Sequence, residues 1–566
     1  MVRLRQKTAE KSREIILRLF FLGSFFYNKA CKLPNDFKNA PMNLFSGRLN
    51  LGELLMEGFF NDYLWPAELS KSVENKEFKY KNDPLKSLNP NTFSWLYILS
   101  GLNTEKSRDF TKFFVENLGV ANINYTPKIW NPNTTALRLC AICLNIRFLD
   151  LAKVFIDRPM MVSLIHFHVL YLSLCKILVP KGLVCLRINS GIFFASLILG
   201  ETLSKRHSLL KKIVKDVSFL MRKDGEFDSR NPEELLEILF LVNRFIKLSS
   251  TAELSRGKID KKLKIFQNQV APILRGLRLG NGKLVRAYGC GGETSQWNLD
   301  KELSDARLKD FSIKKSSLGF YRICAGRLRL IFDGKSNSIE NKSNKYCCPA
   351  FSFELTSGQR TIFQNNSPFN FFLGHTESIV DFKEEFNSVE FSINPKLKTT
   401  APWISNIREV KIYRDQKNNF VEGAKKISIN QWNIIHSRKL IIPISGTEII
   451  GMDQIFSDNT DLDNFGFINA QFFLHPEVNV WKSEKSNYFI LQLKNSEIWC
   501  FETDQENGDL HKYNFLDPKD LQSKKASKIV LKRSLKNQSI SINWRFFLQN
   551  HSSKITREKF INYQKD

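Results

Sequence analysis

The spacing of apolar residues divides the chain into two parts. From about residue 90 to residue 280, apolar side chains recur at intervals of three and four, which is typical of helices that bury one face. The segments with this spacing are 91–102, 135–155, 160–179, 185–203, 209–221, a run that follows Pro232, and 258–279. Their lengths and short connections predict antiparallel helical hairpins packed in layers.

Beyond about residue 300 the pattern changes to short runs rich in β-branched and aromatic residues. Examples are "RLRLIFDGK" at 327–335 and "KLIIPISGTEIIGMDQIF" at 439–456. Runs of this kind, at intervals of roughly ten residues with Gly, Asn or Asp turns between them, predict an antiparallel β-sandwich or stacked sheets.

Helices followed by strands favour packed α and β units over one mixed sheet. We therefore expect an α+β multidomain chain with an N-terminal helical arm and irregular lead-in at 1–90, a helical domain at 91–300 and an antiparallel β-sheet domain at 301–550.

A charged turn precedes one of the predicted helices, in "RKDGEFDSRNPEELLEILF" at 222–240. Asn231 is a suitable N-cap, and Pro232 suits the first helical position because its missing N–H has no partner there. Glu234, three residues after the cap, completes the spacing of a capping box. These signals predict a helix that begins at Pro232, but they leave the role of the charged turn open.

Composition indicates an ordered protein with a preference for polyanions. The chain has 566 residues, 42% of them hydrophobic, which is enough for several cores. The net charge of +27 favours nucleic acid, an anionic membrane surface or an acidic polysaccharide as a partner. Charge alone does not choose among these, and an abundance of Lys as background composition explains it equally well. Since no nucleic-acid-binding signature accompanies the charge, we do not expect nucleic acid.

Several common kinds of site are not indicated by the sequence. It has no P-loop, no dinucleotide-binding glycine fingerprint and no serine nucleophile elbow. Ten scattered cysteines do not form a disulfide framework, and Cys140 and Cys143 lie in an apolar helical run that favours packing. His166 and His168 are two residues apart on a predicted helix and point in different directions, so we interpret them as structural.

The N-terminus has a basic leader and an apolar run, as a signal peptide would. However, Glu10 and Glu14 interrupt the leader, and Arg18 splits the apolar run. We interpret the segment as an amphipathic helix that docks on the fold or makes a peripheral contact with a membrane surface. Without a convincing signal peptide or an apolar stretch of about 18 residues, a cytoplasmic location is favoured over a periplasmic one.

The order of several motifs resembles the heparinase II/III family, in particular its shorter bacterial members. The motifs are "DGEFDSRNP", "GNGKLVRAYGCGGE", "AFSFELTSGQRTIFQNN", "GHTES" and "FFLHPEV", and the likeness extends over about residues 93–547. The resemblance implies an incomplete (α/α) toroid followed by antiparallel β-sheets. It also implies a polysaccharide lyase that cleaves uronic-acid polymers by β-elimination.

Several functional positions of this family carry other residues in this chain. The family segment D-G-G-H-x-x-x-S-P-x-Y matches Asp224, Gly225 and Pro232, whereas Phe227 stands at its His position and Glu234 at its catalytic Tyr position.

In the β part, the family's H-x-H-x-D-x-L-S-F segment places Lys345 at the catalytic His and Cys347 at the metal-binding His. A later acidic ligand would fall near Gln364, and His375 is the one His that is retained. The resemblance therefore implies a degenerate or rearranged active site.

β-Elimination requires a group that neutralises the uronate, a base and an acid. The candidates for substrate binding are Arg187, Asn189, Arg230, Arg286 and the possible stacking platform Trp297, and those for catalysis are Glu234, Lys345 and His375. Arg187 and Asn189 are the nearest candidates by position for the family's Asn/His pair. Trp297 fits a buried interdomain residue equally well.

No cofactor is required by this chemistry, although Cys347 and His375 could offer thiolate and imidazole to a structural zinc ion. A buried cysteine beside a proline turn explains Cys347 as well. The remaining alternative to a lyase is a non-catalytic binding protein for an anionic glycan or a cell-envelope polymer. The sequence does not indicate an oligomeric state.

Overall fold

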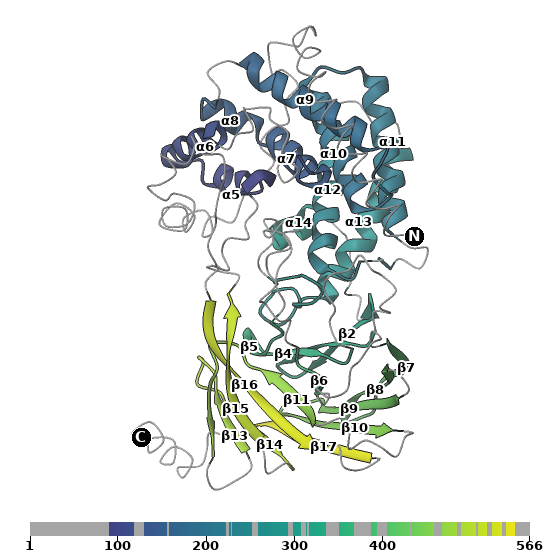
Figure 1. The fold of residues 1–566 in the computed structure, drawn as a ribbon, viewed down its shortest axis with the longest axis vertical. Helices are drawn as coiled ribbons and strands as arrows, with labels where there is room; N and C mark the ends of the chain where they lie inside the picture. The colour runs from purple at the N-terminus through teal and green to yellow at the C-terminus, as the bar shows by residue number, and fades with distance from the viewer. Residues whose placement is uncertain are drawn as a thin grey trace.

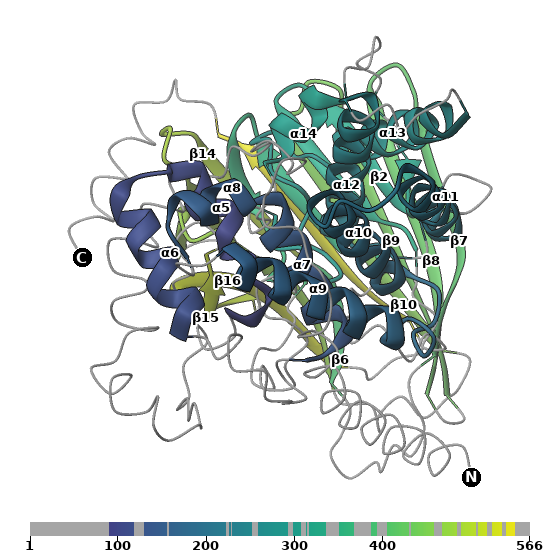
Figure 2. The same ribbon diagram turned by 90° about the horizontal axis from the view of Figure 1, so that it is seen from above.

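The fold is known from a computed structural model that places helices at one end of the molecule and strands at the other (Figure 1). The structure describes residues 90–117, 130–154, 158–221, 226–227, 229–251, 258–292, 298–306, 313, 316–335, 350–366, 386–392, 404–429, 432–457, 467–483, 488–504, 508–517, 523–534 and 539–549. Viewed from above, the helices lie over the sheets (Figure 2). The predicted order of an α part followed by a β part is confirmed.

The helical part consists of successive helices. They are α5 (Trp95–Leu102), α6 (Glu105–Asn117), α7 (Pro132–Leu144), α8 (Ile146–Leu151), α9 (Arg158–Cys175), α10 (Leu183–Ile198), α11 (Leu203–Leu220), α12 (Pro232–Thr251), α13 (Lys258–Gly276) and α14 (Leu299–Asp305). The single helix predicted over 135–155 is wrong, because Asn145 separates α7 from α8 and its amide donates to the Ala141 carbonyl. The helix predicted from Leu209 begins earlier, after the N-cap Thr202.

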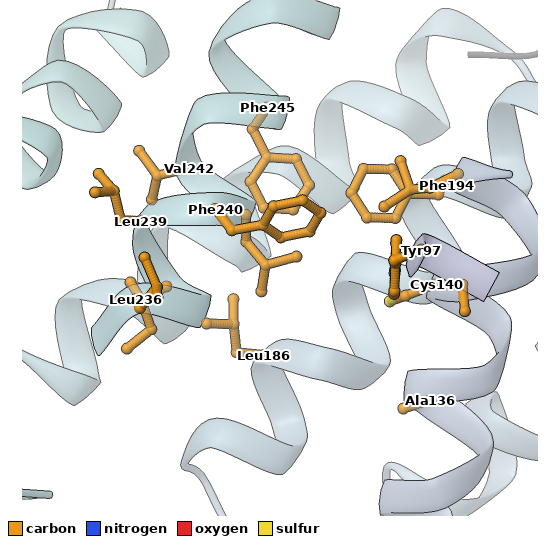
Figure 3. Packing of buried hydrophobic residues seen from close by; sticks show 14 of the residues in the cluster. Tyr97, Ala136, Cys140, Leu186, Phe194, Leu236, Leu239, Phe240, Val242 and Phe245 are labelled. Atoms are coloured by element: carbon orange, nitrogen blue, oxygen red, sulfur yellow. The ribbon is translucent and has the colours of Figure 1, made fainter. Parts of the chain in front are cut away.

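The core of the helical part surrounds α10, whose residues from Cys185 to Ile198 are all buried. Figure 3 shows how Tyr97, Cys140 and Phe194 pack toward α12. The rings of Phe194 and Phe245 stack with their centroids 5.3 Å apart. Cys140 is buried in this cluster, as the packing interpretation of the two cysteines predicted.

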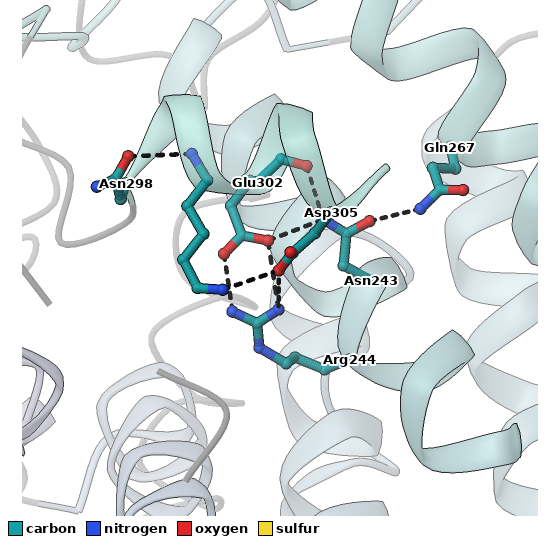
Figure 4. A network of polar contacts seen from close by, with 7 residues as sticks. Asn243, Arg244, Gln267, Asn298, Glu302 and Asp305 are labelled. Carbon is teal, nitrogen blue, oxygen red and sulfur yellow. Dashed lines mark hydrogen bonds and ion pairs between the residues drawn. The ribbon is translucent and has the colours of Figure 1, made fainter. Parts of the chain in front are cut away.

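A buried polar network fastens α14 to the other helices (Figure 4). Nη2 of Arg244 on α12 donates to Glu302 on α14 over 2.8 Å, and both side chains are almost completely buried. Asn243 donates to the same carboxylate at 2.8 Å and accepts a hydrogen bond from Gln267 on α13 at 2.7 Å. Because buried charge is costly without partners, the paired network defines where α14 sits.

The β part contains three antiparallel sheets among the described residues. Their orders are β1-β2-β3-β4-β5, β12-β13-β14-β17-β10-β9-β8-β7 and β15-β16-β11-β6. The strands are β1 (Ser316–Ser317), β2 (Phe320–Ala325), β3 (Leu328–Asp333), β4 (Phe353–Ser357), β5 (Arg360–Phe363), β6 (Val389–Ser392), β7 (Ile404–Arg414), β8 (Asn418–Ile429), β9 (Trp432–Pro443), β10 (Glu448–Ser457), β11 (Phe467–Phe473), β12 (Asn479–Lys482), β13 (Tyr488–Gln492), β14 (Ile498–Thr503), β15 (Gly508–Leu516), β16 (Ser523–Ser534) and β17 (Ser539–Leu548). A common apolar core joins the sheets, so the predicted antiparallel stacked sheets are confirmed.

The two parts are in close contact, and we call this contact the seam. It is formed by residues 229–231 and 277–292 of the helical part against the strands β2 to β5 and β15. Leu318, Phe320 and Ile331 of the β part belong to the same buried cluster as the helices. The backbone N–H of Gly280 donates to Thr356 at 3.0 Å, and a Cβ at Gly280 would lie 2.1 Å from a carbonyl oxygen of the β4–β5 turn. The seam is therefore a packed interface.

Candidate functional site

A buried ion pair joins α10 to α12 near the seam. Nε of Arg187 donates to Glu237 Oε1 at 2.7 Å, and Nη2 donates to Oε2 of the same carboxylate. Nη1 of Arg187 donates to Asn133 Oδ1 at 2.8 Å, near the start of α7. Burial acts to lower the pKa of Arg187, but the Glu237 carboxylate outweighs it and raises that pKa.

Glu234 lies in the first turn of α12, on the side of Arg187. Asn231 Oδ1 accepts the N–H of Glu233 at 2.9 Å and so caps the helix as predicted. The predicted capping box is wrong, since Ser229 rather than Glu234 accepts the N–H of Asn231. Burial raises the pKa of Glu234, while a hydrogen bond with Ser229 and the charge of Arg187 act in the opposite direction. Glu234 as a whole residue is partly exposed, although its carboxyl lies in surroundings where burial has the largest effect on its pKa.

The structure does not bring Asn189 to the same place as Arg187. Asn189 is on the face of α10 that contacts α11, where its amide donates to Asp216 and its carbonyl oxygen accepts from Lys176. Cys185 is a further neighbour of this group, with its Sγ 3.8 Å from Asp216 Oδ1. Arg187 and Asn189 therefore belong to two separate polar clusters.

Arg230 connects the helical part to the β2–β3 hairpin. Its guanidinium donates to the Leu318 carbonyl at 2.6 Å and forms an ion pair with Asp333, and both charged side chains are buried. It also stacks on Tyr288 and Phe320, at 4.4 and 4.6 Å from the ring centroids. The hydroxyl of Tyr288 donates to Asp333 at 2.7 Å. Through these contacts, the buried Arg230 links the helical part to the β part.

Arg286 lies elsewhere in the seam, with its guanidinium 4.5 Å from the centroid of Phe515 on β15. Its backbone N–H donates to Glu354 on β4 at 3.1 Å, and the N–H of Asn365 donates to the same carboxyl at 2.9 Å. Burial raises the pKa of Glu354 to about 8, although both hydrogen bonds act against that rise. His475 of the "FFLHPEV" motif is near, and burial with the charge of Lys283 lowers its pKa to about 4.

The predicted residues Trp297, Lys345, Cys347 and His375 lie outside the described residues. Their roles remain predictions. Gln364, at the position of the family's acidic ligand, is buried, and its Oε1 has no hydrogen-bond partner among the described residues.

An unusual backbone conformation occurs just before β4, which begins at Phe353. Phe351 has a φ of 73°, a left-handed conformation that is rare for a bulky side chain. Lys425 on β8 donates to the Ala350 carbonyl at 2.9 Å, and Nη1 of Arg438 on β9 donates to the Phe351 carbonyl at 2.8 Å. A Cβ at Gly423 would lie 2.6 Å from the Phe351 ring. Phe351 is thus held from two strands of the large sheet.

Asp453 is the centre of the network behind Phe351. It accepts hydrogen bonds from Arg438 at 2.7 and 3.0 Å, from His436 at 2.8 Å and from Trp544 at 3.3 Å. Burial would raise the pKa of Asp453, but the Arg438 charge and the His436 contact outweigh it, so the pKa lies well below its usual value. The network is therefore a fixed support that keeps its negative charge.

Within the described part of the chain, no group of three or more His, Cys, Asp or Glu side chains is arranged to hold a metal ion. The same residues include no helix that is long and apolar enough to cross a membrane.

Two residues of the Arg187 cluster were not predicted from the sequence. Glu237 interrupts the apolar run between Leu236 and Ile238, and a carboxylate on a buried helix face needs a partner. That signal could have identified Glu237 as half of a buried pair. Asn133 follows a proline at a helix start and has no comparable signal.

Comparison with known proteins supports the resemblance seen in the sequence. Residues 385–545 match the family model described as heparinase II/III-like, C-terminal. The crystal structure of heparinase III has 11% identity and a TM-score of 0.59, with 94% of this chain and 91% of that chain covered. Heparan sulfate lyase HepC from Pedobacter heparinus has 10% identity and a TM-score of 0.51, with 97% and 91% covered. No curated protein sequence matches the chain. These solved structures show a common fold.

Proposed function

We propose that the chain is a heparinase II/III-like polysaccharide lyase that acts by β-elimination on an acidic, uronic-acid-containing polysaccharide through a rearranged active site. The observation that carries the proposal is the electrostatic interaction of Arg187 on α10, which is paired with Glu237, with Glu234 in the first turn of α12. Solved proteins with this fold include heparinase III and a heparan sulfate lyase, which act on acidic polysaccharides.

Arg187 supplies hydrogen bonds to the substrate. A guanidinium has five N–H donors, and the bonds to Glu237 and Asn133 use three of them. The other two can donate to the carboxylate of a uronate. Because such bonds stabilise the charge that develops when the C5 proton leaves, they lower the barrier to elimination.

Glu234 supplies proton transfer. The resemblance aligns it with the catalytic Tyr of the family, and burial raises the pKa of its carboxyl above the usual value, which favours the protonated form that a general acid needs. General acid–base catalysis contributes roughly 10²–10⁴-fold to a rate. Lys345 and His375 remain candidates for the second proton-transfer group.

A non-catalytic binding protein is the second candidate. The Glu237 carboxylate already balances the charge of Arg187, which leaves less positive charge for a uronate. A site of this kind can retain polysaccharide recognition while the elimination step is lost.

Incubation with heparan sulfate, chondroitin sulfate and alginate tests the proposal. Elimination creates an unsaturated uronate that absorbs in the near ultraviolet, and calorimetry measures binding separately. We expect product from the unaltered chain, and a loss of roughly 100-fold or more in Glu234→Gln if Glu234 transfers the proton. Asp300→Asn, a change at an exposed side chain of α14, is the matched control. Binding without product supports the second candidate, and neither binding nor product on any polymer contradicts both.

A further inference from the structure

The turn between α9 and α10 exposes apolar side chains between lysines. In the sequence Lys176-Ile-Leu-Val-Pro-Lys181, Ile177 is 81% exposed and Leu178 is 48% exposed. Val179 instead packs against the helical core and anchors the turn. Such exposure of two consecutive aliphatic side chains at a folded turn indicates a surface that another phase or molecule covers.

The end of α11 continues this surface. Phe219 is 51% exposed, and Nζ of Lys181 lies 5.8 Å from the centroid of its ring. Burial lowers the pKa of Lys176, and the charge of Lys212 on α11 lowers it further. Lys212 therefore lies near Lys176. We call Lys176, Ile177, Leu178, Lys181, Lys212 and Phe219 the turn patch.

The acidic group beside the turn patch has its own partners. Asp216 accepts a hydrogen bond from Asn189, and the Sγ of Cys185 contacts its other oxygen. Lys211 and Lys215 add exposed positive charge on α11. The surface around the two aliphatic side chains is therefore positive.

We propose that the turn patch docks on an anionic lipid surface, with Ile177 and Leu178 inserted among the lipid headgroups. Apolar side chains that insert at the interface, together with lysines that attract anionic headgroups, are the two contributions that bind peripheral proteins to membranes. An acidic polysaccharide would use the lysines and an aromatic face, but it gains little from protruding aliphatic side chains. The exposed Ile177 and Leu178 therefore favour lipid over polysaccharide.

The turn patch lies close to the candidate site. α10 begins at Leu183 and reaches Arg187 four residues later, a rise of about 6 Å along the helix. Docking would therefore hold this end of the helical part near the membrane surface. The inference is independent of the proposed lyase activity, since it uses none of the residues assigned to elimination.

Flotation of the full chain with phospholipid vesicles tests the inference. Vesicles of phosphatidylcholine alone are compared with vesicles that also contain phosphatidylserine. We expect binding to the anionic vesicles only. In Ile177→Ser/Leu178→Ser, the loss of apolar insertion lowers the partition coefficient at least about tenfold. Lys181→Ala lowers it about fivefold.

Leu151→Ser is the matched control, because Leu151 is 57% exposed at the end of α8, outside the turn patch. It should bind vesicles as the unaltered chain does. All variants retain residues 1–89, so a loss in the double variant reports on the turn and not on the N-terminal segment. Circular dichroism checks that each variant is folded. Equal vesicle binding by the double variant, or a failure of the unaltered chain to bind anionic vesicles, would overturn the proposal. A matching loss of heparin affinity without vesicle binding would assign the surface to polysaccharide instead.

Discussion

Replacing Asp453 by Asn should destabilise the β part strongly. The carboxylate is completely buried and accepts two hydrogen bonds from Arg438, one from His436 and one from Trp544. Asparagine has only one acceptor oxygen. Its amide group would face the N–H donors of Arg438, His436 or Trp544 and could not accept their hydrogen bonds. The guanidinium of Arg438 would then be a buried charge without its anion.

The loss in free energy of unfolding can be estimated in two ways. Breaking a buried ion pair by removing one partner costs about 3–5 kcal/mol. Counting bonds gives a similar figure, because Asp453→Asn loses about two hydrogen bonds to charged groups, each worth about 1.5–3 kcal/mol. Against a total stability of about 5–15 kcal/mol for a typical domain, this is a large fraction.

Urea unfolding measures the effect, with circular dichroism for the sheets and fluorescence for Trp544 and the other tryptophans. We expect the unfolding midpoint to fall while the dependence on urea stays the same. Asp509→Asn is the control, since Asp509 is 64% exposed and pairs with Lys482 at 3.3 Å. Its effect should stay within about 0.5 kcal/mol.

A second variant separates charge from hydrogen bonding. Arg438→Met/Asp453→Leu removes both charges of this pair together, so part of the stability should return. The recovery should be incomplete, because Arg438 also donates to the carbonyls of Phe351 and Asn387. A loss below about 1 kcal/mol in Asp453→Asn would refute the reasoning, since it would mean that the carboxylate is not needed to balance Arg438.

Three further predictions concern the seam and its supports. The carboxyl of Glu354 has its pKa raised from 4.5 to about 8, so the folded chain holds a proton that the unfolded chain releases, and this group makes stability fall as pH rises through that window. Glu354→Gln should flatten the fall in the urea midpoint between about pH 5 and about pH 8, and an unchanged slope would contradict the assignment. Gly423→Ala places a Cβ 2.6 Å from the ring of Phe351 and should cost about 1–3 kcal/mol in urea unfolding, whereas a neutral result would show that the ring can move. Glu237→Gln leaves Arg187 without its anion and should cost about 3–5 kcal/mol in the same assay, and a smaller loss would mean that the pair is solvated.

Most helices and strands could be predicted from local sequence patterns, because each type of element has a characteristic period of apolar residues. The start of α12 was predictable from the cap at Asn231 and the proline after it. The break between α7 and α8 at Asn145 could not be predicted, because the apolar pattern continues across it. Only the local hydrogen bonds of Asn145 end α7.

The candidate site was harder to predict because its contacts join distant positions. Arg187 and Glu237 are 50 residues apart, and the Arg438 contact to Phe351 spans 87. The separation of Arg187 from Asn189 could have been predicted. Residues two apart on a helix point in different directions, and this rule separates Asn189 from Arg187 as readily as it separates two histidines.

The apolar cluster that crosses the seam limits how such a chain can be recombined in evolution. Leu318, Phe320 and Ile331 follow the last helix in sequence, yet they pack with the helices. Recombination between α14 and β1 would combine a helical part and a β part from different chains. Their apolar surfaces at the seam would then not match. Related chains should therefore inherit both halves together and vary the turns around the seam instead.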